Sequence, residues 1–475
     1  MCIRSDRHQQ AANQNMSNNE HEVRTEGRSP FRGNVLALGL VSLFTDLSSE
    51  MMNPLLPIFI AGLVPLGMAP VYVGLMEGVA ETTASLLKLV SGRLSDYLGK
   101  RKMLVVAGYG LSTCARPLMA LAGLVGTASA GEQVVGLKFL DRVGKGVRTS
   151  PRDALISDSV GPETRGLAFS FTRAMDHAGA VGGSLLAIVI LFGFLGYGLW
   201  RSSAAKPTLE EMTALRWVFA TSLIPGLLAV TTLIWKVREI APKDVGWASA
   251  HADNGSTAEK AAWAEAHPAR LPTRFFAFVG IVVLFTLGNS SDMFLLLYAW
   301  EKFGLGLLAV IGLWIALHIS KIVFSFPGGI LADRIGRRPM ILAGWTMYAL
   351  VYLGFSQAQV QWQFWALFLA YGFYYGMSEG AEKALVADFV PAESRGTGYG
   401  VYNGAIGIAA LPGSLLFGVF WTTIGPGWAF GIGASLAGLA AVLLAALVAG
   451  TGPGSQTQNS AFGVPQQPSQ IPTCD

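Results

Sequence analysis

The feature that most constrains this chain is a succession of long apolar segments. Twelve stretches of about 18 residues or more consist mainly of hydrophobic side chains. Hydrophobic residues make up 52% of the 475 residues and charged residues only 13%, which is too apolar for a soluble protein of this size. We therefore predict an all-α membrane protein with twelve transmembrane helices. The expected helices span residues 34–61, 71–95, 103–125, 132–157, 165–194, 214–236, 273–300, 305–331, 338–356, 361–389, 396–421 and 427–450.

Polar regions divide the expected helices into two sets of six. The predicted domains are an N-terminal six-helix domain over residues 33–236 and a C-terminal one over 273–450, joined by a cytosolic linker at 237–272. Residues 1–32 and 451–475 are polar and are predicted to be disordered cytosolic tails. The first tail contains no apolar signal core, so the first helix is expected to direct its own insertion.

Basic residues in the short loops predict the orientation. The loops on the side of the two termini hold Lys100, Arg101, Lys102, Arg165, Arg334, Arg337, Arg338 and Arg395. The loops on the other side hold only Arg201, Lys206, Arg216 and Lys302. Both termini are therefore expected to face the cytoplasm, in a multi-pass protein of the inner (cytoplasmic) membrane. This asymmetry explains the net charge of +4 and indicates no nucleic-acid partner.

Three internal repeats indicate that the two halves are copies. A loop pattern occurs at residues 92–100 and again at 329–337, each time between two apolar segments. At an offset of 230 positions, residues 146–166 match 376–396 at many points. At an offset of 242, the run Ser-Ser-Glu-Met at 48–51 matches Ser-Ser-Asp-Met at 290–293. Repeats at matching positions predict the same six-helix unit twice.

The repeated loop resembles a motif of the major facilitator superfamily, G-x-L-x-D-x-x-G-[RK]-[RK], which joins helices 2 and 3 and helices 8 and 9. The resemblance extends from about Gly33 to Gly450. It implies two six-helix bundles that rock about a site near the membrane midplane, giving alternating access. It also implies a cytosolic gate, in which we expect Asp96 to pair with Arg152. The gate residues are Gly92, Asp96, Gly99, Lys100, Arg101, Arg152, Gly329, Asp333, Gly336 and Arg337.

Charged residues inside the bilayer are the candidate functional groups, since each costs on the order of 2.5 kcal/mol or more at mid-membrane. Helix 4 carries a polar stripe within about 120° of its circumference. The stripe consists of Lys138, Asp141, Arg142, Lys145, Arg148 and Arg152. The family resemblance implies that helix 4 lines the central cavity, with Lys145 where the motif R-x-x-Q-G usually has Gln. The alternative is that part of the stripe is a structural ion network.

Carboxylates on helices 1 and 7 are candidates for proton coupling. Asp46 and Glu50 lie one turn apart near mid-membrane, and Pro54 and Pro57 are expected to bend the helix beyond them. Asp292 occupies the position in the second half that corresponds to Glu50. A permanent ion pair between one of these acids and an arginine is the alternative. The proposed proton-coupling residues are Glu50, Asp46 and Asp292.

An excess of cations in the first half favours a substrate with an anionic or zwitterionic group, because guanidinium binds carboxylate and phosphate bidentately. The expected substrate-binding residues are Arg142, Arg148, Arg116, Arg173, Asp176, Lys321 and Glu379.

Other classes of protein lack their signatures in this sequence. There is no phosphate-binding G-x-x-x-x-G-K-[ST] and no H-E-x-x-H, and the G-x-S-x-G string at Gly376–Gly380 falls inside an expected transmembrane helix, so neither an ATP-driven pump nor a hydrolytic enzyme is indicated. The three cysteines are too scattered for a metal site, and no cofactor is expected.

We therefore predict a monomeric secondary active transporter, coupled to protons and embedded in the lipid bilayer, that moves a small organic solute. Export is favoured because Gly182 and Gly183 partly match a helix 5 motif of exporters. Proton-coupled uptake of an organic anion or metabolite and a transport-inactive sensor or scaffold are the alternatives.

Overall fold

The computed structural model describes residues 33–98, 100–125, 129–160, 165–201, 206–239, 271–390 and 395–449. Within these ranges every regular element is a helix, as the sequence predicted. The predicted N-terminal tail, most of the linker and the C-terminal tail lie outside the described residues. So do the side chains of several residues near the helix ends.

The helices form twelve rod-like segments whose ends agree with the predicted spans to within a few residues. Three segments are interrupted: segment 1 is divided into α2, η1 and α3, segment 6 into α8 and α9 at Ser222, and segment 7 into α12 and α13. The N-terminal half comprises α2 (Asn34–Glu50), η1 (Asn53–Leu55), α3 (Leu56–Leu63), α4 (Ala69–Leu98), α5 (Arg101–Leu118), η2 (Met119–Leu121), α6 (Ala130–Asp158), α7 (Arg165–Leu195), η4 (Gly196–Trp200), α8 (Leu209–Thr221) and α9 (Leu223–Lys236). The C-terminal half comprises α12 (Thr273–Gly288), α13 (Asp292–Glu301), α14 (Leu307–Ile335), α15 (Arg337–Gln357), α16 (Gln361–Phe389), α17 (Arg395–Ile424) and α18 (Pro426–Ala449).

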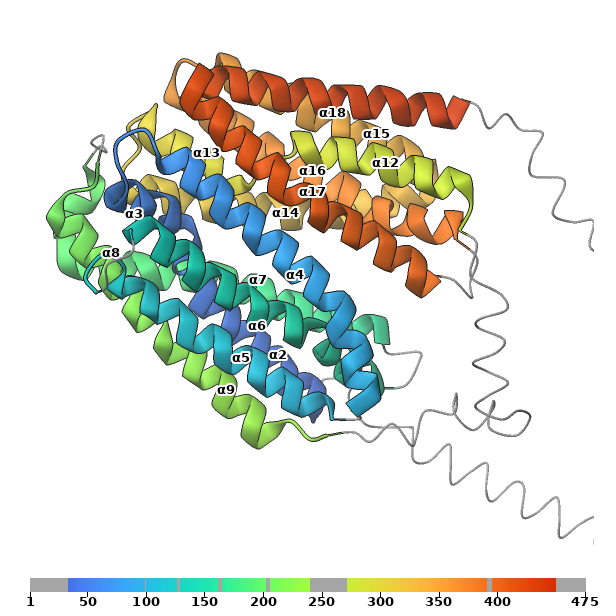
Figure 1. Ribbon diagram of the computed structural model, residues 1–475, viewed down its shortest axis with the longest axis horizontal. Helices are drawn as coiled ribbons and strands as arrows, with labels where there is room; N and C mark the ends of the chain where they lie inside the picture. The colour runs from blue at the N-terminus through green and yellow to red at the C-terminus, as the bar shows by residue number, and fades with distance from the viewer. Residues whose placement is uncertain are drawn as a thin grey trace, which may run out of the picture.

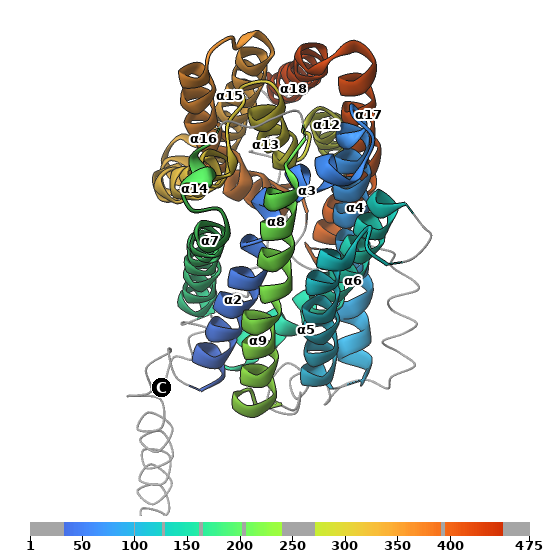
Figure 2. The same cartoon turned by 90° about the vertical axis from the view of Figure 1, so that its left-hand side faces the viewer.

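The two halves lie side by side, with the N-terminal half in blue to green and the C-terminal half in yellow to red (Figure 1). We call the end of the bundle where α2 begins and α4 ends the terminal face, since α18, the last helix, also ends there. The opposite end, where α3 ends and α13 meets α14, is the far face. Figure 2 looks onto the far face and shows the helices of the two halves grouped separately around a shared interface.

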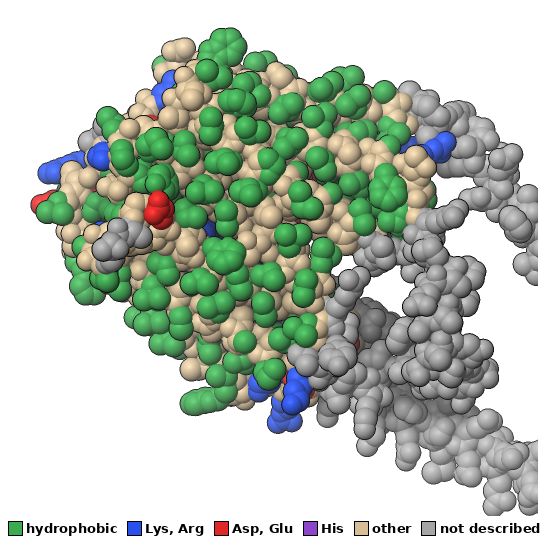
Figure 3. Space-filling model, viewed as in Figure 1, with side chains coloured by type: hydrophobic (Ala, Val, Ile, Leu, Met, Phe, Trp, Pro, Cys, Tyr) green, Lys and Arg blue, Asp and Glu red, His purple; other side chains and the backbone are tan. Residues whose placement is uncertain are grey.

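The outer surface is suited to a bilayer. Hydrophobic side chains cover the middle of the molecule, and most of the lysines, arginines and acids visible in Figure 3 lie toward its edges. Nine stretches among the described residues are long and apolar enough to cross a membrane. The three remaining long helices, α4, α6 and α16, are richer in polar and charged residues. They are the helices on which charge is concentrated inside the protein.

Two glycines let α6 pack closely against its neighbours on both sides. A Cβ atom on Gly144 would lie 2.6 Å from Ser112 Oγ of α5, and one on Gly146 would lie 2.5 Å from Leu87 Cβ of α4. Any larger side chain would push these helices apart. The arrangement recurs in the second half, where a Cβ on Gly376 of α16 would lie 2.5 Å from Phe324 of α14. The matched glycines Gly146 and Gly376 thus give the same close contact between the second and fourth helices of each half.

The halves contact each other along α4 and α17, and near the far face through α3, η1, α13 and α14. A Cβ on Gly78 would lie 2.8 Å from Leu411 Cα, so α4 and α17 approach at backbone distance. Thr82 Oγ1 also donates a hydrogen bond of 2.5 Å to Gly407 O across this contact. The bundle is therefore closed toward the far face.

Candidate functional site

Helix interruptions position an acid near the middle of each half. Segment 1 breaks after Glu50, where α2 ends before η1, as Pro54 and Pro57 predicted. Segment 7 breaks between Gly288 and Asp292, and Ser291 caps α13 by accepting a hydrogen bond from Met293 N. Interrupted helices at membrane depth expose backbone polar groups only where protein or water satisfies them. The two equivalent acids therefore lie at the places where each half is least regular.

Glu50 connects the two halves. Its Oε1 accepts a hydrogen bond of 2.8 Å from Asn53 Nδ2 in its own half. Its Oε2 accepts one of 2.9 Å from the indole Nε1 of Trp314, which lies on α14 in the other half. This carboxylate therefore has partners on both sides of the interface and will lose one of them if the halves separate here.

Asp292 is held within its own half. Lys321 Nζ lies 3.1 Å from its Oδ2, and the hydroxyls of Tyr371 and Tyr375 donate to its Oδ1 at 2.8 and 3.0 Å. The same ammonium group lies 3.7 Å from the centre of the Tyr375 ring, a cation–π contact. The charge of Asp292 is thus balanced by residues that move with it.

The deepest charges of α6 form a buried network. Arg116 on α5 pairs with Asp141 at 2.9 Å and donates to Thr45 O at 3.1 Å. Lys138, only 2% exposed, donates to Asn53 Oδ1 at 3.0 Å. The cavity among these residues measures about 10 Å³, which is the scale of a single water molecule. No organic solute fits there, so Arg116 is placed in a structural network.

Arg148 lies between α5 and α6. It is 6% exposed, donates to Ser112 Oγ at 2.6 Å, and its guanidinium sits 4.3 Å above the centre of the Tyr109 ring. The close approach of α5 and α6 at Gly144 brings these partners within reach. The structure therefore places Arg148 away from the space expected to hold a ligand, and we leave it out of the ligand-binding set proposed below.

Arg142 and Lys145 are partly buried cations of α6 that lack a carboxylate within hydrogen-bond distance in the described part of the chain. Arg142 has its nearest carboxylate, Asp141, at 4.0 Å, beyond hydrogen-bond distance. Lys145 is half-buried and makes no ion pair within the described part of the chain, and its electrostatic neighbours include Arg142, Glu81 and Asp46. Lys145 was noted in the sequence as a departure from the family motif but was not among the expected binding residues. The position of Lys145 in the polar stripe is the sequence feature that could have identified it as a binding residue.

Further charges from both halves face the terminal side of the interface. Arg173 on α7 is 69% exposed and lies 4.0 Å from Asp176. Glu379 on α16 pairs with Lys383 at 2.9 Å, and both side chains are exposed. Glu379 also interacts electrostatically with Arg173 and Lys321, which brings α7, α14 and α16 to one region. Of the expected binding residues, Arg173 and Glu379 have the side chains most open to solvent.

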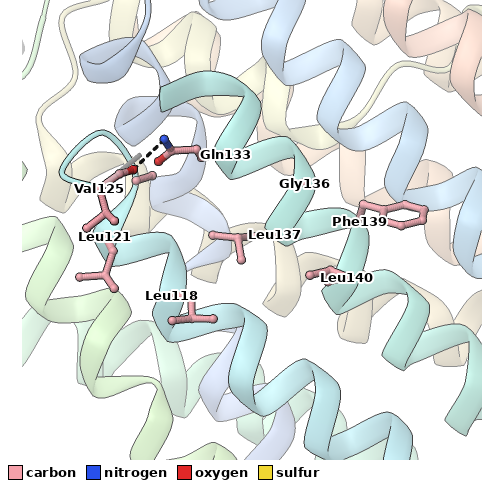
Figure 4. Close-up of a pocket in the computed structure, with 9 residues that line it drawn as sticks. Leu118, Leu121, Val125, Gln133, Gly136, Leu137, Phe139 and Leu140 are labelled. Carbon is pink, nitrogen blue, oxygen red and sulfur yellow. Dashed lines mark hydrogen bonds between the residues drawn. The ribbon is translucent and has the colours of Figure 1, made fainter. Parts of the chain in front are cut away.

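An apolar groove on the outer surface is not part of this site. It measures about 550 Å³ and lies between α5 and α6 on the outer surface, where leucines and Phe139 line it (Figure 4). Gln133, the polar side chain of the groove, is already bonded to Val125 O and Gly123 N. A groove without charge on the lipid-facing surface does not belong to a path for polar solutes.

Comparison with known proteins identifies the family. The sequence model described as Major Facilitator Superfamily matches residues 38–320 and 277–471. The chain belongs to the major facilitator superfamily. Among its relatives, an uncharacterized MFS-type transporter of Methanocaldococcus jannaschii is 31% identical over 438 residues, covering 91% of this chain and 98% of the relative. An uncharacterized protein of Mycobacterium bovis is 26% identical over 384 residues, covering 81% and 85%.

A solved structure supports the same fold. The crystal structure of a D-xylose-proton symporter superposes with a TM-score of 0.66 at 18% identity, covering 86% of this chain and 96% of the symporter. At this identity the likeness shows the fold alone. The family and the fold together make this chain a multi-pass membrane transporter, as the sequence predicted.

The superfamily loop motif is only partly described. The side chains of Asp96, Asp333 and Arg165 and the residue Gly99 lie outside what the structure describes, and Gly329 lies within α14. Gly336 has φ of 103°, a conformation that favours glycine at this turn. Arg101 pairs with Asp158, and Arg337 pairs with Asp388 and donates to Ala384 O at 2.7 Å. In each half, a basic residue after the turn therefore clamps the end of the fourth helix.

The expected partner of Asp96 has other contacts. Arg152 binds Asp153 Oδ1 at 3.1 Å and donates to Ser42 Oγ at 3.2 Å. An Asp96–Arg152 pair stays a prediction, since the Asp96 side chain is not described. Lys100 is exposed beside the turn.

Proposed function

We propose that this superfamily member is a proton-coupled secondary active transporter that exports a small organic solute with an anionic or zwitterionic group. The observation that carries the proposal is the position of Glu50, at a helix break and bonded to both halves. A carboxylate whose partners change with the conformation binds protons with different affinity in the two states. That difference is what coupling requires.

The charge of the groups that are not fully buried supports an anionic substrate. Arg142 and Lys145 lack close carboxylate partners, and Arg173 is open to solvent. With Arg116 and Arg148 buried among protein partners, we propose Arg142, Lys145, Arg173, Asp176, Lys321 and Glu379 as the substrate-binding residues. Asp46 and Asp292 remain candidates for coupling beside Glu50. The surroundings of Asp292 are expected to change less between conformations, because its partners lie in its own half.

We also propose that the terminal face is cytosolic and that the protein is a monomer in an inner membrane. The concentration of lysine and arginine in the loops of that face supports this orientation. With the far side closed, the state described here would open to the cytosol.

Proton flux into proteoliposomes tests the proposal directly. Vesicles that contain a pH-sensitive dye are given single carboxylates, amino acids or phosphate monoesters, each compared with an uncharged analogue. We expect at least one charged solute to move protons through the wild type and not through Glu50→Gln. Glu382→Gln is the matched control, because Glu382 Oε1 also accepts from an indole, Trp345 Nε1 at 2.8 Å, but within one half.

The outcomes separate the alternatives. Opposite movement of solute and protons indicates export by antiport, and movement in the same direction indicates uptake by symport. Solute flux with no proton flux would show a uniporter, and equal transport of the uncharged analogues would refute the anionic substrate. Absence of flux for every solute, with binding retained, would favour a sensor.

A further inference from the structure

Two hydrogen bonds join side chains of opposite halves within the membrane interior. Trp314 Nε1 donates to Glu50 Oε2 at 2.9 Å, and Ser291 Oγ donates to Glu77 Oε2 at 3.2 Å. In both cases the acceptor is a carboxylate of the N-terminal half and the donor a neutral group of the C-terminal half. Hydrogen bonds to an ionised acceptor are about twice as strong as neutral ones.

The two carboxylates are linked to each other inside the N-terminal half. Glu50 Oε1 accepts from Asn53 Nδ2, and Asn53 Oδ1 accepts from Lys138 Nζ at 3.0 Å. The same ammonium group lies 3.8 Å from Glu77 Oε1, which has no hydrogen bond to any described residue. A continuous polar chain therefore runs from Glu50 through Asn53 and Lys138 to Glu77.

This chain lies where the halves are in contact. Asn53 begins η1 and Ser291 precedes α13, and η1, α3, α13 and α14 contact one another toward the far face. Nearer the terminal face, Arg173 and Glu379 are exposed instead. Separation of the halves on the far side would break both cross-half hydrogen bonds and leave Oε2 of Glu50 and Oε2 of Glu77 without these donors.

We propose that Glu50, Asn53, Glu77, Lys138, Ser291 and Trp314 form a latch that holds the far side of the transporter closed. Trp314 and Ser291 are its releasable ends. Lys138 and Asn53 are positioning residues, which align the two carboxylates with their donors and contact no substrate. The latch goes beyond the proposed function and does not depend on proton coupling, because it concerns the equilibrium between conformations.

Two pairs of variants test the latch against matched controls. Trp314→Phe keeps the ring and removes the N–H, and Trp345→Phe does the same to an indole that also binds a glutamate but within one half. Ser291→Ala is matched by Ser290→Ala, whose hydroxyl contacts Tyr352 OH in its own half at 2.9 Å. Each change removes one hydrogen-bonding group from a buried or partly buried side chain, so general destabilisation affects both members of a pair. Ser291→Ala also removes the cap of α13, whereas Trp314→Phe removes only the hydrogen bond to Glu50.

The readout is the distance between spin labels on the far face. Leu209 and Trp362 are 84% and 69% exposed, lie in different halves, and are replaced by cysteine for labelling in a chain whose Cys2, Cys114 and Cys474 are serine. We expect Trp314→Phe and Ser291→Ala each to raise the population with a long distance by about tenfold over their controls, which is the loss of about 1.4 kcal/mol. Equal populations in test and control variants would overturn the latch.

A double-mutant cycle tests the positioning role. Lys138→Met and Ser291→Ala are expected to be non-additive in the same distance measurement, since both act on Glu77. Should Lys138→Met fail to fold, Asn53→Ala combined with Trp314→Phe gives the equivalent cycle through Glu50. Additive effects would show that the residue only supports the fold and would remove it from the latch.

Discussion

The two halves place an acid at the same point of the repeat and treat it differently. Glu50 shares its hydrogen bonds between the halves, whereas Asp292 is neutralised by Lys321 and two tyrosines of its own half. Residues at equivalent positions of the two repeats can thus differ in role, because their partners lie in different halves. A partner in the other half makes a charge sensitive to the conformation, and a partner in the same half makes it insensitive.

The largest expected effect is on Glu50. Glu50→Gln should reduce uphill transport under a pH gradient to the level of protein-free liposomes, because the amide cannot take up and release the proton. Exchange of labelled for unlabelled solute should continue, since it requires no net protonation. The comparison with Asp292→Asn sharpens the result. If Glu50→Gln still concentrates the solute normally, or if only Asp292→Asn loses uphill transport, then Asp292 rather than Glu50 is the coupling residue.

The next effect concerns the repeated loop. Asp96→Asn is expected to cut turnover strongly with little change in substrate affinity, and Asp333→Asn to cut it less. The second copy has no equivalent partner, because Lys383 pairs with Glu379 and Glu382 binds Trp345 and Tyr402. Initial rates in reconstituted vesicles measure both. Equal losses in the two variants would show that the copies share one role.

A third effect is on stability. Asp292→Asn removes the carboxylate that balances the Lys321 ammonium in a partly buried site, and we expect a loss of about 3–5 kcal/mol in the free energy of unfolding. Adding Lys321→Met should recover much of that loss, because the positive charge that Asp292 balances is then removed as well. Thermal melting in detergent provides the measurement. If Asp292→Asn alone were as stable as the wild type, the contacts of Asp292 with its neighbours would not contribute to stability.

A fourth effect separates two arginines of α6. Arg142→Lys should weaken binding of an anionic solute by about 1.5–3 kcal/mol if its charged hydrogen bonds to the solute are lost. Arg148→Lys should leave affinity unchanged and lower the melting temperature, because lysine cannot both bond Ser112 and stack on Tyr109. Equilibrium binding and melting on the same preparations distinguish the roles. Loss of affinity in Arg148→Lys alone would return that residue to the binding site.

The smallest effect is expected at the terminal side of α16. Lys383→Gln breaks an exposed pair with Glu379 one turn away, and such pairs contribute only about 0.3–0.5 kcal/mol. The melting temperature should therefore stay close to that of the wild type. A shift as large as that of Asp292→Asn would show that this pair is not solvent-screened.

Much of the fold could be predicted from the sequence because long apolar segments and repeats report local structure. The break after Glu50 was marked by Pro54 and Pro57. The break before Asp292 was missed, although Gly288, Asn289 and two serines are residues that favour helix ends. Inside an apolar span, glycine, asparagine and serine predict a helix break less reliably than proline does.

The site was harder to predict because its contacts join distant parts of the chain. At about 100° per residue, Arg142 and Arg148 lie at opposite edges of a stripe some 120° wide, so one edge can face α5 while the other faces the interface. The sequence gives the width of the stripe and not the neighbours on either side. The bond between Trp314 and Glu50 spans 264 residues, and no local pattern marks it.

The buried pairs of α6 have a consequence for how the protein is made. A lone helix that carries Lys138, Asp141 and Arg142 would pay about 2.5–3.5 kcal/mol for each charge placed at the bilayer centre. The partners of Lys138 and Asp141, which are Asn53, Glu77 and Arg116, all precede α6 in the chain. During synthesis, the groups that neutralise this helix have therefore left the ribosome before the helix itself. The order of the chain thus allows its most polar membrane segment to enter the bilayer as the fourth member of a group rather than alone.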